Sequence, residues 1–293
     1  MAEPKISYKL NKKIYDEAFN VDFLAEYNLS LQVNNELFRI CITDAAKNRC
    51  LYLEDYQLQS VNSVEDLLEQ LGLIYEDHIV LTAGFWGSVR VAIKNNSFSL
   101  IPVPLFEKQY LKEYLSINAA AEKTEDVYYY KQNSLNAINI FAADKRIIDF
   151  FNSKYPKKNI LYVHHTSPLI EGILVEENKH GRSMYLHAGN NMVTILVKKE
   201  KNLEFCNSFH YSNADDFVYF TMFVMDELEL NPENTPVTIW GEITPDSIEY
   251  KKLYKYIRNI GFGDKPSSLK FGYYFDEVFD HNFFDLYTMH LCE

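Results

Sequence analysis

The order of secondary-structure elements repeats once along this chain of 293 residues. The first half opens with a pattern typical of a three-strand meander, which a helix and then a strand follow. The same order begins again at Met184. The two meanders cover residues 29–33, 37–43 and 50–56 in the first half, and 184–189, 192–199 and 203–211 in the second. A repeat at half the chain length indicates an internal duplication, so we expect an N-terminal lobe over residues 1–170 and a C-terminal lobe over residues 171–293.

The remaining segments alternate between strand and helix patterns. Ser63 precedes an amphipathic segment with acidic residues in its first turn, which predicts a capped helix. Ser167 as a cap and Pro168 at the first helical position predict another. Further strands are expected over 78–85, 88–94, 97–106, 127–132, 137–143, 159–166, 236–243 and 269–275, and further helices over 107–118, 144–156, 213–230 and 246–262. This alternation indicates an α/β protein with mixed sheets and flanking helices.

Composition and charge exclude several classes of function. The sequence has 41 acidic and 29 basic residues, and its net charge of −12 repels the phosphates of nucleic acids and anionic lipid head groups. No run reaches the ~18–20 apolar residues that span a bilayer, and the N-terminus lacks the apolar core of a signal peptide. We therefore expect a cytoplasmic protein that binds no nucleic acid and does not insert into membranes. Its four cysteines are expected to be reduced thiols.

The first turn of each meander offers candidate binding residues. The turn in the first half carries Asn34 and Asn35, and the turn in the second half carries His187, Gly189 and Asn190. The Asn pair stands opposite Gly189 and Asn190 at a shift of 155 residues. Asparagine tolerates left-handed turn conformations, so a structural role in the turns best explains the Asn pairs at 34–35 and 190–191, with ligand binding as the alternative.

This duplicated frame resembles the two lobes of the actin-like ATPase fold, which is ribonuclease H-like. The resemblance implies that an Asp, followed two residues later by Gly, faces the phosphates of ATP in each first turn. The first turn here has neither residue, whereas the second has His187 at the Asp position and keeps Gly189. Histidine cannot replace a carboxylate on magnesium, which prefers hard oxygen ligands. The resemblance therefore implies an ATPase frame without its catalytic acids.

A single glycine, Gly241, stands where the resemblance leads us to expect a glycine-rich turn that holds adenosine. Capping of the following helix by Thr244 or Asp246 is the alternative explanation for this segment. The candidate residues of a degenerate nucleotide cleft are Asn34, Asn35, His187, Gly189, Asn190 and Gly241. We expect no catalytic residue, no metal site and no cofactor, with ATP as the alternative.

Three other features carry weaker functional signals. His164 and His165 end a strand, so their rings are expected on opposite faces, where they cannot chelate one metal. Asp144 is expected to cap a helix rather than act as an acid. Phe85 and Trp86 stand between two glycines and predict either an exposed patch or a buried hinge.

Segments spread over most of the chain are similar to an uncharacterised bacterial family known as domain of unknown function 3822. They read SFSLIPVPLF, YLHAGNNM, NSFHYSNADDFVYFTMFVMDELEL, PVTIWGEITPDS, KYIRNIGF and LCE. This resemblance implies the same actin-like ATPase fold and carries no activity with it. The region INIFAADKRIIDFFNSKYPKKNILYVHHTSPLIEGIL is also similar to the pilus-assembly protein PilM and to the cytoplasmic domain of type II secretion platform proteins. Those relatives are assembly scaffolds, only some of which bind ATP.

These observations favour a non-catalytic module that binds a ligand or takes part in an assembly. We expect a protein partner of unknown identity, and a homodimer is the alternative. The rival hypothesis is a nucleotide-binding ATPase or kinase-like enzyme whose acidic groups have moved, for instance to Asp215, Asp216 or Asp246. An inert structural subunit with tyrosine-rich interfaces is the third hypothesis.

Overall fold

Six strands form the sheet of the N-terminal lobe. The computed structural model describes residues 8–119, 121–176, 181–189 and 191–293. The sheet has the order β1-β4-β3-β2-β5-β9. Its strands are β1 (Tyr8–Tyr15), β2 (Tyr27–Val33), β3 (Leu37–Asp44), β4 (Arg49–Leu58), β5 (Ser88–Ile93) and β9 (Leu161–His164). The meander β2-β3-β4 and its added strand β1 pair antiparallel, whereas β5 runs parallel to β2 and β9 runs parallel to β5.

Both faces of this sheet are covered, and β3 is buried at every position. Ile40 and Ile42 belong to the core that the sheet shares with helices α1 (Val64–Asp77) and α4 (Lys145–Lys154). Cys41, which lies between them in sequence, belongs to a second core that the C-terminal residues complete. Because side chains alternate across a strand, burial at every position requires a covering layer on each face.

The caps of α1 and α4 follow from local sequence. Ser63 Oγ accepts a hydrogen bond from the Asp66 N–H group at 3.1 Å, and the Asp66 carboxylate accepts one from the Ser63 N–H group at 3.0 Å. This reciprocal pair is a capping box at the start of α1. Asp144 accepts from the Arg146 N–H group at 2.9 Å, which confirms its predicted role as the cap of α4.

The C-terminal lobe repeats the topology of the first. Its sheet has the order β12-β11-β10-β13-β14. The strands are β10 (Arg182–Gly189), β11 (Met192–Lys199), β12 (Asn202–His210), β13 (Val237–Gly241) and β14 (Ile260–Phe262), and the helices are α5 (Thr166–Val175), α6 (Ala214–Glu227) and α7 (Ile248–Leu253). β10 pairs antiparallel with β11 and parallel with β13, as β2 does with β3 and β5. The predicted duplication is thus confirmed in strand order and direction.

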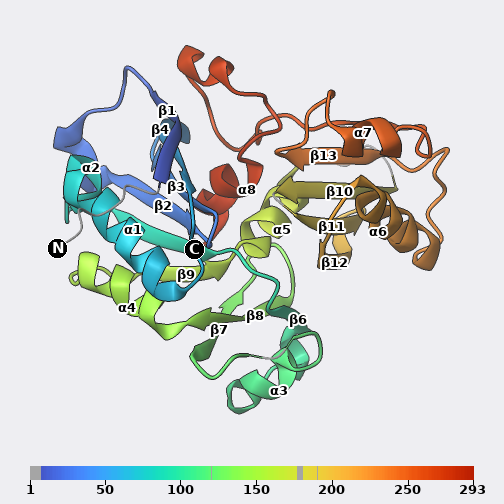
Figure 1. Ribbon diagram of the computed structural model, residues 1–293, viewed down its shortest axis with the longest axis horizontal. Coiled ribbons are helices and arrows are strands. Elements are labelled where there is room, and N and C mark those ends of the chain that lie inside the picture. Colours follow the sequence, from blue (N-terminus) through green and yellow to red (C-terminus); the bar gives the residue numbers. More distant parts are fainter. Residues whose placement is uncertain (1–7, 120, 177–180, 190) are drawn as a thin grey trace.

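A small third sheet extends from the N-terminal lobe (Figure 1). Its antiparallel strands have the order β6-β8-β7 and pack against helix α3. The elements are β6 (Phe98–Pro102), β7 (Glu125–Lys131), β8 (Ala137–Asp144) and α3 (Leu111–Leu115), with short 3-10 turns at Val103–Leu105 and Lys108–Tyr110. Another 3-10 turn, Val21–Glu26, precedes β2.

The C-terminal segment, residues 264–293, leaves the second sheet and returns to the first lobe (Figure 1). It contains only short helices, which are η4 (Tyr273–Glu277), α8 (Phe284–Tyr287) and η5 (Thr288–Leu291). Leu286 and Tyr287 are fully buried in the second core of the N-terminal sheet. Arg90 Nε donates to the Cys292 carbonyl at 2.6 Å and fixes the end of the segment to β5. α8 therefore lies between the two lobes, while the predicted division at residue 170 stays a prediction.

The structure corrects two predictions in the N-terminal lobe. Residues 78–85, expected as a strand, contain the short helix α2 (Ile79–Thr82). His78 caps this helix, since its Nδ1 atom accepts from the Leu81 N–H group at 3.1 Å. β5 consequently takes the place that corresponds to β13 in the duplication. β1 was not predicted, because its mostly exposed residues give no apolar alternation.

Further corrections concern the C-terminal half. The helix expected over 246–262 is split into α7 and the strand β14. Ser247 is the N-cap residue of α7, so neither Thr244 nor Asp246 caps it. Ser167 does not cap α5, because that helix begins at Thr166 and Ser167 already lies inside it. Residues 269–275, expected as a strand, form a single bridge from Lys270 to Arg49 and the start of η4.

Candidate functional site

The turn between β2 and β3 places Asn34 and Asn35 at the edge of the space between the lobes. Asn34 Oδ1 accepts hydrogen bonds from the N–H groups of Glu36 at 2.9 Å and Leu37 at 2.8 Å. This pattern is the side-chain-closed turn expected of asparagine. Both Asn residues line a pocket of about 500 Å³ that also contains Asn191 of the other lobe. Asn190 lies outside the described residues.

The two candidate glycines are required for different reasons. Gly241 has a φ of +103°, and a Cβ atom there would lie 1.9 Å from the Ala188 carbonyl oxygen. Only glycine fits this position, so the backbone alone explains it. Gly189 ends β10, and a Cβ atom there would lie 3.1 Å from the Nζ atom of Lys94. The absence of a side chain at Gly189 thus leaves room beside a charged group.

A carboxylate from the C-terminal segment occupies the centre of the site. Asp285 of α8 is fully buried, and its Oδ2 atom accepts from Gln32 Nε2 of β2 at 2.6 Å. Its Oδ1 atom lies 3.3 Å from His187 Nε2 of β10. Gln32 and His187 occupy equivalent positions, because the same shift of 155 residues relates them. The two duplicated strands therefore converge on an acid that belongs to neither.

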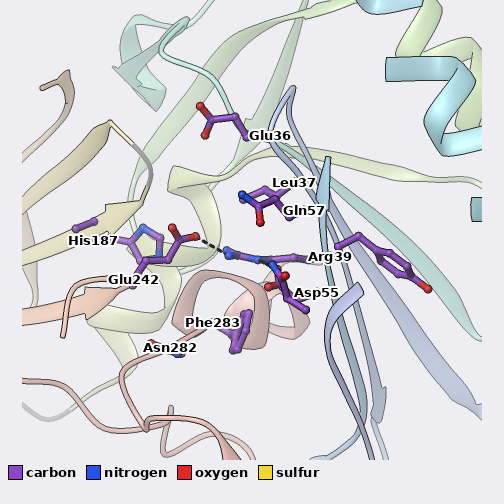
Figure 2. A pocket seen from close by; sticks show the side chains of 13 residues that line it. Glu36, Leu37, Arg39, Asp55, Gln57, His187, Glu242, Asn282 and Phe283 are labelled. Carbon is purple, nitrogen blue, oxygen red and sulfur yellow. Dashed lines mark hydrogen bonds and ion pairs between the residues drawn. The ribbon is translucent and has the colours of Figure 1, made fainter. Parts of the chain in front are cut away.

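Arg39 of β3 joins the two lobes through Glu242 (Figure 2). The charge of Arg39 also acts on Asp285. The Nε atom of Arg39 donates to Asp55 Oδ1 of β4, and its Nη2 atom donates to Glu242 Oε1, just after β13; both distances are 2.6 Å. The guanidinium carbon lies 5.0 Å from the centre of the Phe283 ring. This arrangement is a two-sided ion pair that rests on an aromatic face.

The predicted residues divide between two adjoining pockets. His187 and Gly241 line the smaller one, the Arg39 pocket, with a volume of about 320 Å³. Asn34 and Asn35 line the larger one, the Lys94 pocket, with a volume of about 500 Å³. Both pockets include Glu36.

Charge attraction decides the protonation of the central acid. Burial by itself would raise the pKa of Asp285, but His187, Lys94 and Arg39 together hold that pKa well below its ordinary value. Burial lowers the pKa of Lys94, although the neighbouring Asp285 opposes this shift. The pKa of Glu242 is lowered in spite of burial, because Arg39 and Lys94 favour its charged form. The site is therefore a cluster of opposite charges in which the carboxylates are ionised.

Sequence reasoning missed Gln32, Arg39 and Asp285. Gln32 could be found by applying the shift of 155 residues to His187. Arg39 stands in an otherwise apolar strand, LFRICI, which is a signal that a buried charge needs partners. Asp285 interrupts the apolar run FFDLY in the same way.

The histidine pair differs from its prediction. The rings of His164 and His165 lie side by side, with centres 4.3 Å apart, because His165 already has helical backbone angles at the start of α5. Burial lowers the pKa of His164 to about 3, so it is neutral. Within the described residues, no group of three His, Cys, Asp or Glu side chains is placed to hold a metal ion. Phe85 is 74% exposed and Trp86 is fully buried, so the two aromatic residues do not share one environment, and a hinge role stays a prediction.

Two duplicated lobes with a polar centre between them define the class of protein: a two-lobed α/β protein with the actin-like ATPase fold. A protein of unknown function with this fold from Bacteroides thetaiotaomicron VPI-5482 is similar at a TM-score of 0.79 and 21% identity, over 94% of this chain and 99% of that chain. The chain belongs to the family described as protein of unknown function (DUF3822), whose model matches residues 16–260. The predicted fold and family are confirmed.

The expected likeness to assembly proteins is also found at the level of the fold. A chain of the PilM-PilN type IV pilus biogenesis complex is similar at a TM-score of 0.54 and 11% identity, over 91% of this chain and 98% of that chain. The cytoplasmic domain of EpsL, an inner membrane component of the type II secretion system of Vibrio cholerae, is less similar. Its TM-score is 0.41 at 10% identity, over 84% of this chain and 89% of that chain.

No curated protein matches the sequence. None of the helices in the described part of the chain is long and apolar enough to cross a membrane.

Proposed function

We propose that this protein is a non-catalytic binding or assembly module, built on an actin-like ATPase scaffold whose cleft its own C-terminal segment closes. The observation that carries the proposal is Asp285. This acid lies between Gln32 and His187, at the equivalent positions of the two duplicated strands. A residue of the chain itself thus occupies the space between the two strands that lead into these turns.

The residues at this centre are a poor fit for a magnesium-bound triphosphate. Asp285 already accepts hydrogen bonds from Gln32 and from the Leu286 N–H group. The Arg39 guanidinium and the Lys94 ammonium lie in the same cluster and would repel a metal cation. Magnesium keeps near-ideal octahedral oxygen coordination, which a carboxylate with occupied oxygens does not supply. This chemistry supports binding without hydrolysis.

The likeness to a chain of the PilM-PilN complex supports the assembly role. That protein belongs to a type IV pilus biogenesis complex, and we extend to this chain only the class of role. We propose a protein partner, with a second copy of this chain as the alternative. The four free cysteines support a reducing, cytoplasmic location.

An enzyme with relocated acids is the second candidate, and one observation favours it. Asp55 and Glu242 line the Arg39 pocket, and Asp285 lies close enough to Arg39 to interact with its charge. The relocated acids suggested by the sequence are less suitable, since Asp215 and Asp246 are exposed and pair with lysines of α7. Asp216 accepts from the Ser212 N–H group at the start of α6.

Hydrolysis of ATP separates the two candidates. Phosphate release with ATP and magnesium is measured for the wild type, Asp285→Asn and the surface control Asp246→Asn. We expect no magnesium-dependent release from any of the three, and no change in melting temperature on adding ATP and magnesium. Hydrolysis that Asp246→Asn keeps and Asp285→Asn loses would overturn the proposal in favour of the enzyme.

A further inference from the structure

Two buried lysines in this protein have different surroundings. Lys198 of β11 is 1% exposed, and its Nζ atom donates to the carbonyls of Ile173 at 2.6 Å and Glu176 at 2.7 Å. Lys94, just after β5, is 6% exposed, yet its ammonium makes neither a hydrogen bond nor an ion pair within the described ranges of the chain. Burying an unpaired ammonium costs free energy that a hydrogen-bonded one recovers. Lys94 therefore lacks the partners that its burial demands.

The space beside Lys94 is the larger of the two inter-lobe pockets. Lys94 and Asn34 come from the N-terminal lobe, and Asn191 and His210 come from the other lobe. The oxygen of the Asn34 amide is already used within its turn, which leaves its NH₂ group available as a donor. Gly189 adds no side chain where a Cβ atom would lie 3.1 Å from the ammonium. The pocket thus presents a positive charge and an amide donor to a ligand.

The acidic side chains that line this pocket limit the charge of what can enter. They are Glu36, Glu122, Glu125 and Asp144, of which Asp144 pairs with Arg146 at 2.7 Å. These carboxylates, and the net charge of −12, repel polyanions such as a nucleoside triphosphate. A single small anionic group meets less repulsion and reaches the lysine.

Lys94 also has a purely structural explanation. Arg39 supplies one positive charge for the three carboxylates of Asp55, Glu242 and Asp285, and Lys94 adds a second positive charge at longer range. Charge balance accounts for the sign of the side chain. It does not account for donors left without acceptors beside an open pocket of about 500 Å³.

We propose that the Lys94 pocket binds one small anionic group, a carboxylate or a phosphate, that accepts hydrogen bonds from the Lys94 ammonium and the Asn34 amide. This inference deepens the proposed function, because it names the class of ligand that the closed scaffold binds without turning it over.

Calorimetric titration with inorganic phosphate and with acetate tests the proposal, at an ionic strength held constant with chloride. Charge-assisted hydrogen bonds contribute enough that Lys94→Met should weaken the wild-type affinity at least about tenfold. Lys47→Met, which removes a lysine that is paired with Asp44 on the surface, should bind like the wild type. Binding of phosphate alone or of acetate alone identifies the source of the group. A wild type that binds neither, or full affinity in Lys94→Met, overturns the proposal.

A second measurement needs no variant and covers the case that Lys94→Met does not fold. Reductive methylation of lysines by formaldehyde and dimethylamine–borane, which releases no carboxylate or phosphate, is followed by mass spectrometry in the wild type, with and without the anion that binds. The anion should slow the modification of Lys94 and leave Lys47 unchanged. Equal rates at Lys94 would overturn the proposal. Nucleotide and magnesium are absent from the titration and from the lysine modification. Failure of anion binding in these two assays therefore leaves the proposed non-catalytic role intact. ATP hydrolysis would overturn the non-catalytic role but not anion binding.

Discussion

Two carboxylates with no exposed surface, Glu54 and Asp285, have opposite kinds of surroundings. Glu54 lies within the N-terminal lobe, where Tyr52, Tyr56 and His78 donate to it at 2.5, 2.8 and 2.6 Å, and Lys13 pairs with it at 2.8 Å. Asp285 lies between the lobes, and among the described residues Gln32 is its one close side-chain donor, at 2.6 Å.

The polar atoms around Asp285 are incompletely paired. Gln32 Oε1 and His187 Nε2 are buried without an aligned hydrogen-bond partner in the described residues, and Lys94 lacks one as well. Polar networks that are fully satisfied stabilise one structure, whereas unsatisfied groups in a native protein call for an explanation. We infer that the Glu54 centre holds the first lobe together and that the Asp285 centre retains unused capacity for a ligand.

The largest expected effect is that of Glu54→Gln. His78 Nδ1 accepts from Leu81, so its Nε2 atom must donate, and Lys13 donates on the other side. Either orientation of the new amide sets its NH₂ group against one of these fixed donors. We expect a loss of about 3–5 kcal/mol in the free energy of unfolding, as for removing one partner of a buried ion pair.

Urea denaturation measures this loss, with Glu69→Gln on the exposed face of α1 as the control. The control should unfold like the wild type. If both variants unfold alike, the Glu54 centre does not stabilise the lobe, and the contrast with Asp285 fails.

The pH dependence of stability gives a second test of the same centre. Burial alone would raise the pKa of Glu54, but the hydrogen bonds from His78, Lys13 and Tyr52 lower it to about 2 from an ordinary 4.5. The unfolded chain then binds more protons than the folded one, so the contribution of Glu54 is complete above pH 4.5 and declines as the pH falls toward 2. Glu54→Gln should flatten this acid decline in urea midpoints. An equally steep decline in the variant would assign it to other carboxylates.

Asp285→Asn should lower the free energy of unfolding less than Glu54→Gln does, although both acids are buried. The Gln32 amide can reverse its orientation, so that its unpaired Oε1 atom accepts from the new NH₂ group. Charge attraction to Lys94 and Arg39 is still lost. We expect a loss of about 1.5–3 kcal/mol in the free energy of unfolding, typical of one hydrogen bond to a charged group. A loss as large as that of Glu54→Gln, measured in the same urea series, would contradict the difference between the two centres.

The elements that sequence could predict are those fixed by local pattern. The meander β2-β3-β4 alternates apolar residues between turn residues, and Ser63 and Asp66 form a cap within four positions. The duplication follows from the same local signals in both halves. The residues of α2 were predicted as a strand because their apolar run is short. The helix is capped by the ring of His78, which accepts a hydrogen bond from the Leu81 N–H group, and the apolar pattern does not indicate this contact.

The site could be predicted only where it belongs to the duplicated turns. His187 and Gly189 were found in this way, and Gln32 follows from the shift of 155 residues. The apolar run around Asp285 marks a buried charge, but its contact with Gln32 spans 253 residues and nothing local indicates that its partner lies in the first lobe. In the sequence, Lys94 is an ordinary polar residue at the end of a strand, and only the pocket beside it indicates a binding role.

The smallest expected effect is that of Glu242→Gln, at the outer arm of the ion pair between the lobes. The Glu242 side chain is 36% exposed, and Arg39 keeps Asp55 when this arm is neutralised. Partly exposed ion pairs contribute about 0–1 kcal/mol, so we expect a loss within that range in urea denaturation. Asp55→Asn serves as the matched control. Because the Asp55 side chain is only 13% exposed, this substitution should lower the free energy of unfolding more than Glu242→Gln does. If Glu242→Gln proved the more costly of the two, the outer ion pair would contribute more to stability than the inner one. The Asp285 centre would then resemble the Glu54 centre, because its charged groups would serve chiefly to hold the structure together.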